Sequence, residues 1–193
     1  MKKDIILAGV GGQGILSIAA IIGTAAINAG LFLKQAEVHG MSQRGGDVQS
    51  HLRLSSEEIA SDLIPGGKTD LIVSVEPMES LRYLPMLSPD GWLITNTEPF
   101  VNIPNYPDIN KVISEIEAFP RHIALNAEKI AKDLGSVRTA NIVMLGASAP
   151  FLDLDYNFLE DAIRNIFQNK GENIIKVNID AFHTGLKFAE ENK

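Results

Sequence analysis

The sequence contains no cysteine. This excludes disulfides, thiolate nucleophiles and cysteine-ligated iron-sulfur clusters from the chain, because each needs sulfur supplied by the polypeptide itself. Any such cluster must be bound by another polypeptide. Basic residues are also few, with 17 Lys and Arg against 24 Asp and Glu and a net charge of -7. A mildly acidic surface of this kind argues against nucleic acid as a partner.

The sequence also lacks a convincing membrane segment. The most apolar stretch, Ile15 to Leu33, contains polar residues and is broken by Gly23 and Gly30, so it is expected to form a buried core helix and no membrane span. At the start of the chain, Asp4 interrupts a run that otherwise resembles a signal peptide. We therefore expect a cytoplasmic protein without a membrane partner.

Metal-ligand spacing and a hydrolase triad are absent from the sequence. The four histidines, His39, His51, His122 and His183, show no H-x-x-x-H pattern, so no metal site is expected. Ser17 and Ser42 lie near glycines but lack a G-x-S-x-G elbow. The segment from Pro65 to Thr69 lacks the full phosphate-loop pattern and is interpreted as a turn.

What the sequence does contain is the pattern of a layered α/β domain. Its 193 residues, 45% of them hydrophobic, fit one domain covering residues 1–193 with a substantial core. No linker or repeat divides it. We expect a three-layer domain with a mostly parallel or mixed sheet.

The expected elements follow from runs of apolar residues, helical periodicity, and Gly or Pro boundaries. Strands are expected at residues 3–10, 31–37, 47–54, 70–75, 91–95 and 121–125. The third should be half exposed, because Gln49, His51 and Arg53 alternate with apolar or small residues. Helices are expected at residues 15–29, 77–87, 109–118, 127–134, 139–147, 157–169 and 174–190, with Asn141 and Asn178 as helix caps, and a long surface loop at residues 98–108.

A glycine-rich loop follows the first strand. Gly9, Gly11 and Gly14 fit G-x-G-x-x-G at the start of a helix, where backbone N–H groups and the helix dipole favour a phosphate. Glu37 lies at roughly the distance, about 20 residues, at which a dinucleotide site places its acidic residue. The alternative is a tight turn that needs glycine only for its backbone angles and close packing.

A second unusual segment is His39-Gly-Met-Ser-Gln-Arg-Gly-Gly-Asp47. Its glycines permit close backbone approach, and the planar fork of Arg44 suits a carboxylate or a phosphate. A contact with a ligand or a partner is therefore one interpretation. The other is a surface loop with a solvated arginine.

Three stretches together resemble one family. They are GVGGQGI at residues 9–15, GMSQRGGDVQSHLR at residues 40–53, and NIVMLGA at residues 141–147 followed by NIDAFHTG at residues 178–185. This pattern resembles the gamma-type subunit of 2-oxoacid:ferredoxin oxidoreductases over most of the chain. The Met-Ser-Gln-Arg-Gly-Gly form is most similar to the beta subunit of indolepyruvate ferredoxin oxidoreductase.

The resemblance implies a subunit that is inactive alone and binds no cofactor by itself. Thiamine diphosphate and iron-sulfur clusters would lie on a companion subunit, which oxidatively decarboxylates a 2-oxoacid, reduces ferredoxin and releases an acyl-coenzyme A. In this family the module packs against the thiamine-binding domains, on the side where coenzyme A enters as co-substrate. Matching the motifs residue by residue gives a candidate cofactor-binding set and no catalytic residue: Gly9, Gly11, Gly12, Gly14, Arg44, Gly45 and Gly46.

Two other functions remain open from the residues alone. A stand-alone NAD(P)-binding dehydrogenase domain is supported by the glycine loop with Glu37, but the chain has no second domain for a substrate. A binding module that shares the fold and has no enzyme partner is the other, because a fold does not define a function.

Overall fold

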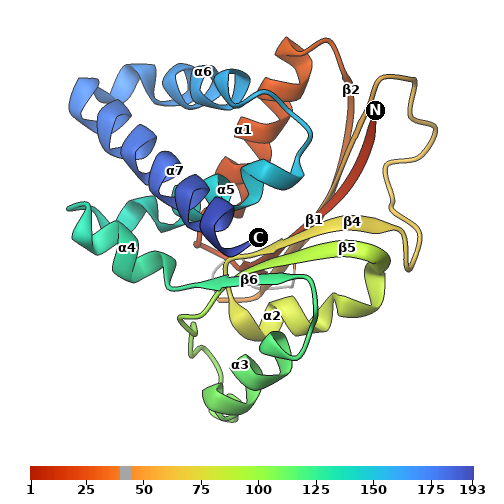
Figure 1. Ribbon diagram of the computed structural model, residues 1–193, viewed down its shortest axis with the longest axis vertical. Coiled ribbons are helices and arrows are strands. Elements are labelled where there is room, and N and C mark those ends of the chain that lie inside the picture. The colour runs from red at the N-terminus through yellow and green to blue at the C-terminus, as the bar shows by residue number, and fades with distance from the viewer. Residues whose placement is uncertain (40–44) are drawn as a thin grey trace.

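The computed structural model describes residues 1–39 and 45–193, with His39 described by its backbone alone. Within these residues the chain forms one α/β domain with a six-stranded mixed sheet covered by helices on both faces (Figure 1), which confirms the expected fold class. The strands are β1 (Lys2–Val10), β2 (Phe32–His39), β3 (Asp47–Ser55), β4 (Thr69–Ser74), β5 (Leu87–Asn96) and β6 (His122–Leu125).

The helices also occur where the sequence pattern places them. They are α1 (Ile15–Asn28), α2 (Pro77–Arg82), α3 (Ile109–Glu117), α4 (Ala127–Asp133), α5 (Ala140–Ser148), α6 (Tyr156–Phe167) and α7 (Glu172–Asn192). Short 3-10 turns η1 (Leu84–Met86), η2 (Val137–Thr139), η3 (Ala149–Phe151) and η4 (Gln168–Lys170) connect or extend them. No helix in the described ranges is long and apolar enough to cross a membrane.

The strand order is β2-β3-β1-β4-β5-β6. Strands β1, β4, β5 and β6 are parallel neighbours, whereas β3 is antiparallel to both β1 and β2. Because β3 lies between β1 and β2, the strand that follows α1 ends up at the sheet edge and not beside β1. The carboxyl ends of β1, β4 and β5 meet at one edge of the sheet.

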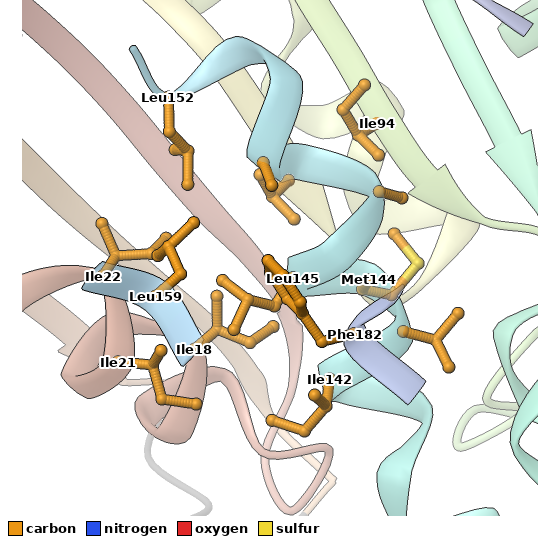
Figure 2. Close-up of a cluster of buried hydrophobic side chains, with 14 of the residues drawn as sticks. Ile18, Ile21, Ile22, Ile94, Ile142, Met144, Leu145, Leu152, Leu159 and Phe182 are labelled. Carbon is orange, nitrogen blue, oxygen red and sulfur yellow. The ribbon is translucent and has the colours of Figure 1, made fainter. Parts of the chain in front are cut away.

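Two hydrophobic cores hold the layers together. The larger core lies between the sheet and α1, α5, α6 and α7, and includes Ile18, Ile22, Leu145, Leu159 and Phe182 (Figure 2). Helix α5 is apolar around most of its circumference, as expected for a helix surrounded by protein. Helix α1 is equally apolar, but Leu16 and Ile27 on its outer face are exposed. The smaller core lies under α2 and α3 on the opposite face.

The expectation that the third strand is half exposed was wrong. The segment at residues 56–68 covers the polar face of β3, so His51 and Arg53 are buried. Arg53 forms an ion pair with the fully buried Asp4 at 2.7 Å and donates to the carbonyl oxygens of Ser61 and Leu63. A strand with alternating polar residues can be buried on both faces when its polar groups are all paired.

Candidate functional site

The candidate site lies where the connections leaving the sheet diverge. From β1 the chain passes into α1 on the larger-core face, and from β4 it passes into α2 on the opposite face (Figure 1). In α/β sheets, a crevice at the carboxyl ends of parallel strands forms at such a switch point and is the usual ligand site. The glycine loop after β1 occupies this position.

Packing requires glycine at two positions of the loop. A Cβ atom on Gly9 would overlap a methyl group of Val75 at the end of β4. Gly14 has a φ of 82°, and a Cβ atom there would press against the side chain of Asn141 on α5. The structure of the turn alone is therefore enough to explain glycine at these two positions, as the tight-turn interpretation proposes. Anion binding is not excluded by this, because the same turn leaves the start of α1 without a side-chain cap.

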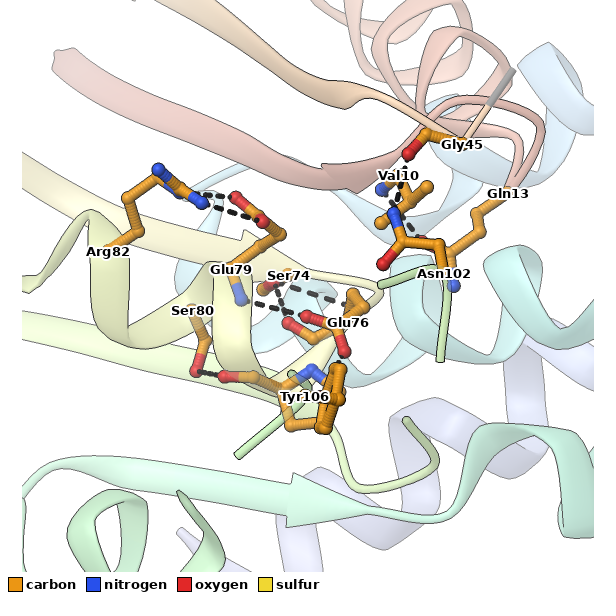
Figure 3. Close-up of polar contacts among 11 residues, drawn as sticks. Val10, Gln13, Gly45, Ser74, Glu76, Glu79, Ser80, Arg82, Asn102 and Tyr106 are labelled. Carbon is orange, nitrogen blue, oxygen red and sulfur yellow. Dashed lines mark hydrogen bonds and ion pairs between the residues drawn. The ribbon is translucent and has the colours of Figure 1, made fainter. Parts of the chain in front are cut away.

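Gln13 fastens the loop to both strands (Figure 3). Its Oε1 atom accepts a hydrogen bond from the Val10 backbone at 2.8 Å, and its Nε2 atom donates to the Val75 carbonyl oxygen at 3.2 Å. One side chain thus links the ends of β1 and β4. The loop is held in place before any ligand arrives.

The two glycine motifs of the sequence meet in space. The Gly11 backbone N–H donates to the Gly46 carbonyl at 2.9 Å, and the Gly45 N–H donates to the Gly11 carbonyl at 3.3 Å. The glycine loop and the segment at Gly45 and Gly46 are therefore joined through the backbone of Gly11, whereas Gly9 is buried beneath the loop. Arg44 lies outside the described residues. The role of this set in cofactor binding stays a prediction.

A cavity of about 620 Å³ opens beside the glycine loop. This is a volume typical of small-ligand sites. Gly12, Gly14 and Ser17 form one wall at the start of α1, and Gly9, Gly11, Gly45 and Gly46 lie outside the lining. Much of the remaining lining comes from η2, α5, the end of α6, η4 and α7: Val137, Arg138, Asn141, Met144, Phe167, Lys170, Ile174, Val177 and Asn178.

The charges on the cavity wall favour an anionic ligand. Arg138 and Lys170 are exposed lining residues, and neither forms an ion pair within the described residues. Together with the backbone N–H groups at the start of α1, they give the cavity lining positive potential. The apolar residues Phe167, Ile174 and Val177 provide a surface for a ring or an alkyl chain.

Glu128 is the acidic residue of the lining. Burial raises the pKa of its carboxyl group, an effect that the neighbouring Asn96 amide partly offsets. Its Oε2 atom is buried and has no hydrogen-bond partner among the described residues. Burial without a full set of hydrogen bonds thus disfavours the charged form of this carboxyl group.

The interpretation of Asn141 and Asn178 as helix caps was wrong. Asn141 lies inside α5 and donates to the Gly14 carbonyl oxygen at 3.2 Å, and Asn178 lies inside α7 and donates to the Ile174 carbonyl oxygen at 2.7 Å. Both line the cavity. Helix α5 begins at Ala140 and α7 at Glu172, so Asn141 lies in the first turn of α5 and Asn178 lies well inside α7, and neither side chain caps a helix start.

Glu76 is the buried polar centre on the other side of the glycine loop (Figure 3). It caps α2 by accepting from the Glu79 backbone N–H at 2.8 Å. Its other carboxylate oxygen accepts from the Phe100 backbone N–H and from the Tyr106 hydroxyl. Burial, followed by this hydrogen bond, raises the pKa of the Tyr106 hydroxyl. Glu76 thus ties residues 97–108 to the carboxyl end of β4.

The histidines lie apart from one another, and the contacts of His51, His122 and His183 are explained by local structure. His51 accepts a hydrogen bond from the Ile64 backbone N–H at 3.0 Å, His122 contacts the Phe119 carbonyl oxygen at 2.6 Å, and His183 lies 3.1 Å from Glu160. No group of three or more His, Asp or Glu residues that could hold a metal ion is found in the described ranges. The side chain of His39 is outside the description.

The position of Glu37 weakens the dinucleotide interpretation. Glu37 pairs with Ser50 of β3, and Ser50 pairs in turn with Leu7 of β1. Glu37 is therefore level with the middle of β1 and two strands away from it, about 10 Å at the usual strand spacing. In a dinucleotide site the acidic residue lies beside the glycine loop. The inserted antiparallel strand prevents that arrangement.

Sequence reasoning missed most of the cavity wall. Arg138, Lys170 and Glu128 had no motif around them, and they come together only through the packing of α4, η2 and η4 around α5 and α7. Glu76 and Tyr106 lie in different segments and gave no local signal either. The polar residues at the ends of β4 and β5, Glu76 and Asn96, were the available hint, because side chains there face the switch point.

Comparisons with known proteins agree with this architecture. The family model described as pyruvate ferredoxin/flavodoxin oxidoreductase matches residues 4–188. Indolepyruvate oxidoreductase subunit IorB of Thermococcus kodakarensis is 38% identical, over 99% of this chain and 98% of its own length. No support for an NAD(P)-dependent dehydrogenase emerges.

Two solved structures share the fold. The gamma subunit of a keto/oxoacid ferredoxin oxidoreductase from Geobacter sulfurreducens matches with a TM-score of 0.72 and 25% identity, over 98% of this chain and 99% of its own. A 2-oxoglutarate:ferredoxin oxidoreductase from Magnetococcus marinus, solved with 2-oxoglutarate, coenzyme A and succinyl-CoA, matches with a TM-score of 0.78 and 24% identity. The match covers 98% of the present chain and 31% of the longer Magnetococcus chain. The chain therefore belongs to the pyruvate ferredoxin/flavodoxin oxidoreductase family.

Proposed function

We propose that this chain is the subunit without redox cofactors in a 2-oxoacid ferredoxin oxidoreductase that acts on indolepyruvate or a related arylpyruvate. The observation that carries the proposal is the match along the whole chain, at 38% identity, to an indolepyruvate oxidoreductase subunit. Motif spacing, full-length coverage and the fold all point to the same subunit type.

The chemistry of the chain supports a division of labour. Without cysteine it cannot ligate an iron-sulfur cluster. We assign the clusters and thiamine diphosphate to a companion subunit, with ferredoxin as the electron acceptor of the complex and the cytoplasm as its compartment. Thiamine diphosphate supplies the stabilised carbanion that decarboxylation of a 2-oxoacid needs. The present chain contributes surfaces that bind coenzyme A and the companion subunit.

We assign the cavity beside the glycine loop to coenzyme A. Its phosphates would contact Arg138, Lys170 and the start of α1, and Asn141 and Asn178 would supply further polar contacts. The apolar residues of η4, α6 and α7 suit the adenine ring or the pantetheine chain. The exposed part of the glycine loop, Gly11 to Gly14, and the adjoining Gly45 and Gly46 would then face the companion subunit.

Reconstitution tests this function. The purified chain should be colourless and should not reduce ferredoxin or a viologen dye with indolepyruvate and coenzyme A. Adding the thiamine-bearing companion should restore dye reduction that depends on both compounds. Turnover by this chain alone, or a companion that is equally active without it, would contradict the proposal. Parallel assays with NAD⁺ as the electron acceptor test the alternative of a stand-alone dehydrogenase, which predicts reduction of NAD⁺ by this chain alone.

A further inference from the structure

Residues 97–108, between β5 and α3, form a segment that we name the strap. It carries three exposed apolar side chains in four positions, with Phe100 43% exposed, Val101 68% and Ile103 42%. Its proline content, at positions 99, 104 and 107, resists both helix and interior strand. An exposed apolar cluster of this kind marks a surface for another molecule more often than isolated exposed residues do.

The strap is fixed to the rest of the domain at several points (Figure 3). Glu76 accepts hydrogen bonds from the Phe100 backbone and the Tyr106 hydroxyl, and the Asn102 amide donates to the Gly45 carbonyl oxygen. At its start, the Asn96 side chain donates to the Glu98 carbonyl oxygen at 3.2 Å. The apolar side chains are thus presented by a preformed backbone, which reduces the entropy lost when a partner binds.

The position of the strap connects it with the glycine motifs. Gly45, which accepts from Asn102, also donates to Gly11 of the glycine loop. The strap, Gly45 and the glycine loop therefore form one continuous surface at the carboxyl edge of the sheet. A stable interface buries about 800 Å² on each partner, more than three side chains supply, so the strap would be the apolar centre of a larger contact.

The charge of the strap indicates which kind of partner binds there. It contains two acidic residues, Glu98 and Asp108, and no basic residue, in a chain whose net charge is -7. Two copies of this chain that met through their straps would oppose like charges. A different protein with an apolar pocket and a basic rim fits better.

We propose that the strap is a docking surface for the thiamine-bearing companion subunit, centred on Phe100, Val101 and Ile103. The inference rests on the proposed function for the identity of the partner. Glu76 and Tyr106 act as positioning residues, because they hold the strap in the conformation that presents these side chains.

The test is the affinity of the full chain for the companion subunit. Val101→Asp and Ile103→Asp should each raise the dissociation constant about tenfold or more, as for hot-spot residues at the centre of an interface. Leu63→Asp is the matched control, because Leu63 is a similarly exposed loop residue, 55% exposed, in the segment that precedes β4 at the opposite edge of the sheet. Its affinity should be that of the wild type. The melting temperatures of all three isolated variants should stay close to the wild-type value.

Tyr106→Phe provides a second readout. Without the hydroxyl donor to Glu76, amide hydrogen exchange at Phe100 and Asn102 should become faster and association weaker, although the exposed side chains are unchanged. Wild-type affinity in both aspartate variants would overturn the inference, and so would a wild-type homodimer that Val101→Asp dissociates. Failure of the wild-type chain itself to bind the companion would instead reject the proposed function.

Discussion

At the residue scale, buried polar side chains on β3 explain why residues 56–68 lie against the sheet. Arg53 joins Asp4 of β1 to two carbonyl oxygens of that segment, and His51 accepts a hydrogen bond from the Ile64 backbone. This non-helical segment therefore covers the polar face of β3 through hydrogen bonds to its side chains. Removing one partner would leave a buried group unpaired, which costs about 1–3 kcal/mol.

His51 should make the stability of the domain depend on pH. Burial, followed by the charge of Arg53, lowers its pKa below the ordinary value, while Asp62 and Asp4 act in the opposite direction more weakly. Below the pKa of the unfolded chain, about 6.5, the unfolded state binds more protons than the folded state. The contribution of neutral His51 is therefore complete above that pH and is lost as the pH falls through the folded pKa.

Melting temperatures between pH 7.5 and 5 test this prediction. The free energy of unfolding of the wild type should fall with decreasing pH, by at most about 1.4 kcal/mol per pH unit from this group. His51→Asn keeps an acceptor for Ile64 and should lower this slope. An equal slope in both proteins would show that His51 does not carry the effect.

Arg138 is the residue with which to test the coenzyme A assignment. It is exposed and unpaired within the described residues, so Arg138→Ala should leave the melting temperature nearly unchanged. Loss of a charge-assisted contact of about 1.5–3 kcal/mol predicts roughly a tenfold to hundredfold weaker affinity for coenzyme A. Calorimetry with coenzyme A and the KM for coenzyme A in the reconstituted enzyme measure this change in affinity.

Arg164→Ala on α6 is the control for Arg138, because Arg164 is also exposed but does not line the cavity. The control should bind coenzyme A like the wild type. Equal weakening in both variants would indicate only a general effect of charge, and unchanged binding in Arg138→Ala would remove this residue from the site.

At the element scale, the crossing of α5 and α7 decides the shape of the cavity. Gly146 of α5 and Gly185 of α7 let the two backbones touch, since a Cβ atom on Gly146 would overlap the Phe182 carbonyl oxygen and one on Gly185 would overlap the Val143 carbonyl oxygen. This close approach permits Cα–H···O contacts between the helices. It also places Asn141 and Asn178 on the same cavity, which explains why the two helical motifs occur together.

Gly146→Ala should therefore destabilise the domain. The added methyl group meets backbone atoms that cannot rotate away, so the helices must separate, at a cost of about 1–3 kcal/mol that exceeds the usual benefit of alanine in a helix. Thermal unfolding should show a melting temperature lower by several degrees, on the order of 2–4 °C per kcal/mol for this size.

The control for the helix crossing is Gly66→Ala, in a turn where a Cβ atom meets no neighbour within 4 Å. Its melting temperature should change little. If Gly146→Ala were as stable as this control, the helix crossing would tolerate a wider separation than the packing indicates. Coenzyme A binding in the Gly146 variant then reports whether the cavity depends on the crossing.

At the scale of the whole molecule, topology separates this family from a dinucleotide-binding domain with the same glycine pattern. A G-x-G-x-x-G loop and an acidic residue at the right sequence distance are present, but β3 separates the strands that carry them. The glycine loop instead contacts Gly45 and Gly46 through its backbone. A surface built from two loops and the strap is suited to a protein partner.

The sequence by itself determined the elements and the family. Apolar runs, helical periodicity and Gly or Pro boundaries are local properties, so the strands, helices and the long surface loop could be predicted within a few residues of their observed ends. The missing cysteines needed no structure either, because ligand chemistry depends on residue type alone.

Only the tertiary structure decided the order of the strands, the burial of His51 and Arg53, and the cavity that joins Arg138 and Lys170 to the glycine loop. Each depends on residues far apart in the chain. Asn141 and Gly14, for example, are 127 positions apart and share a hydrogen bond. Local patterns carry no information on which distant segments pack together, because the free energy of that choice comes from burying and pairing all of them at once.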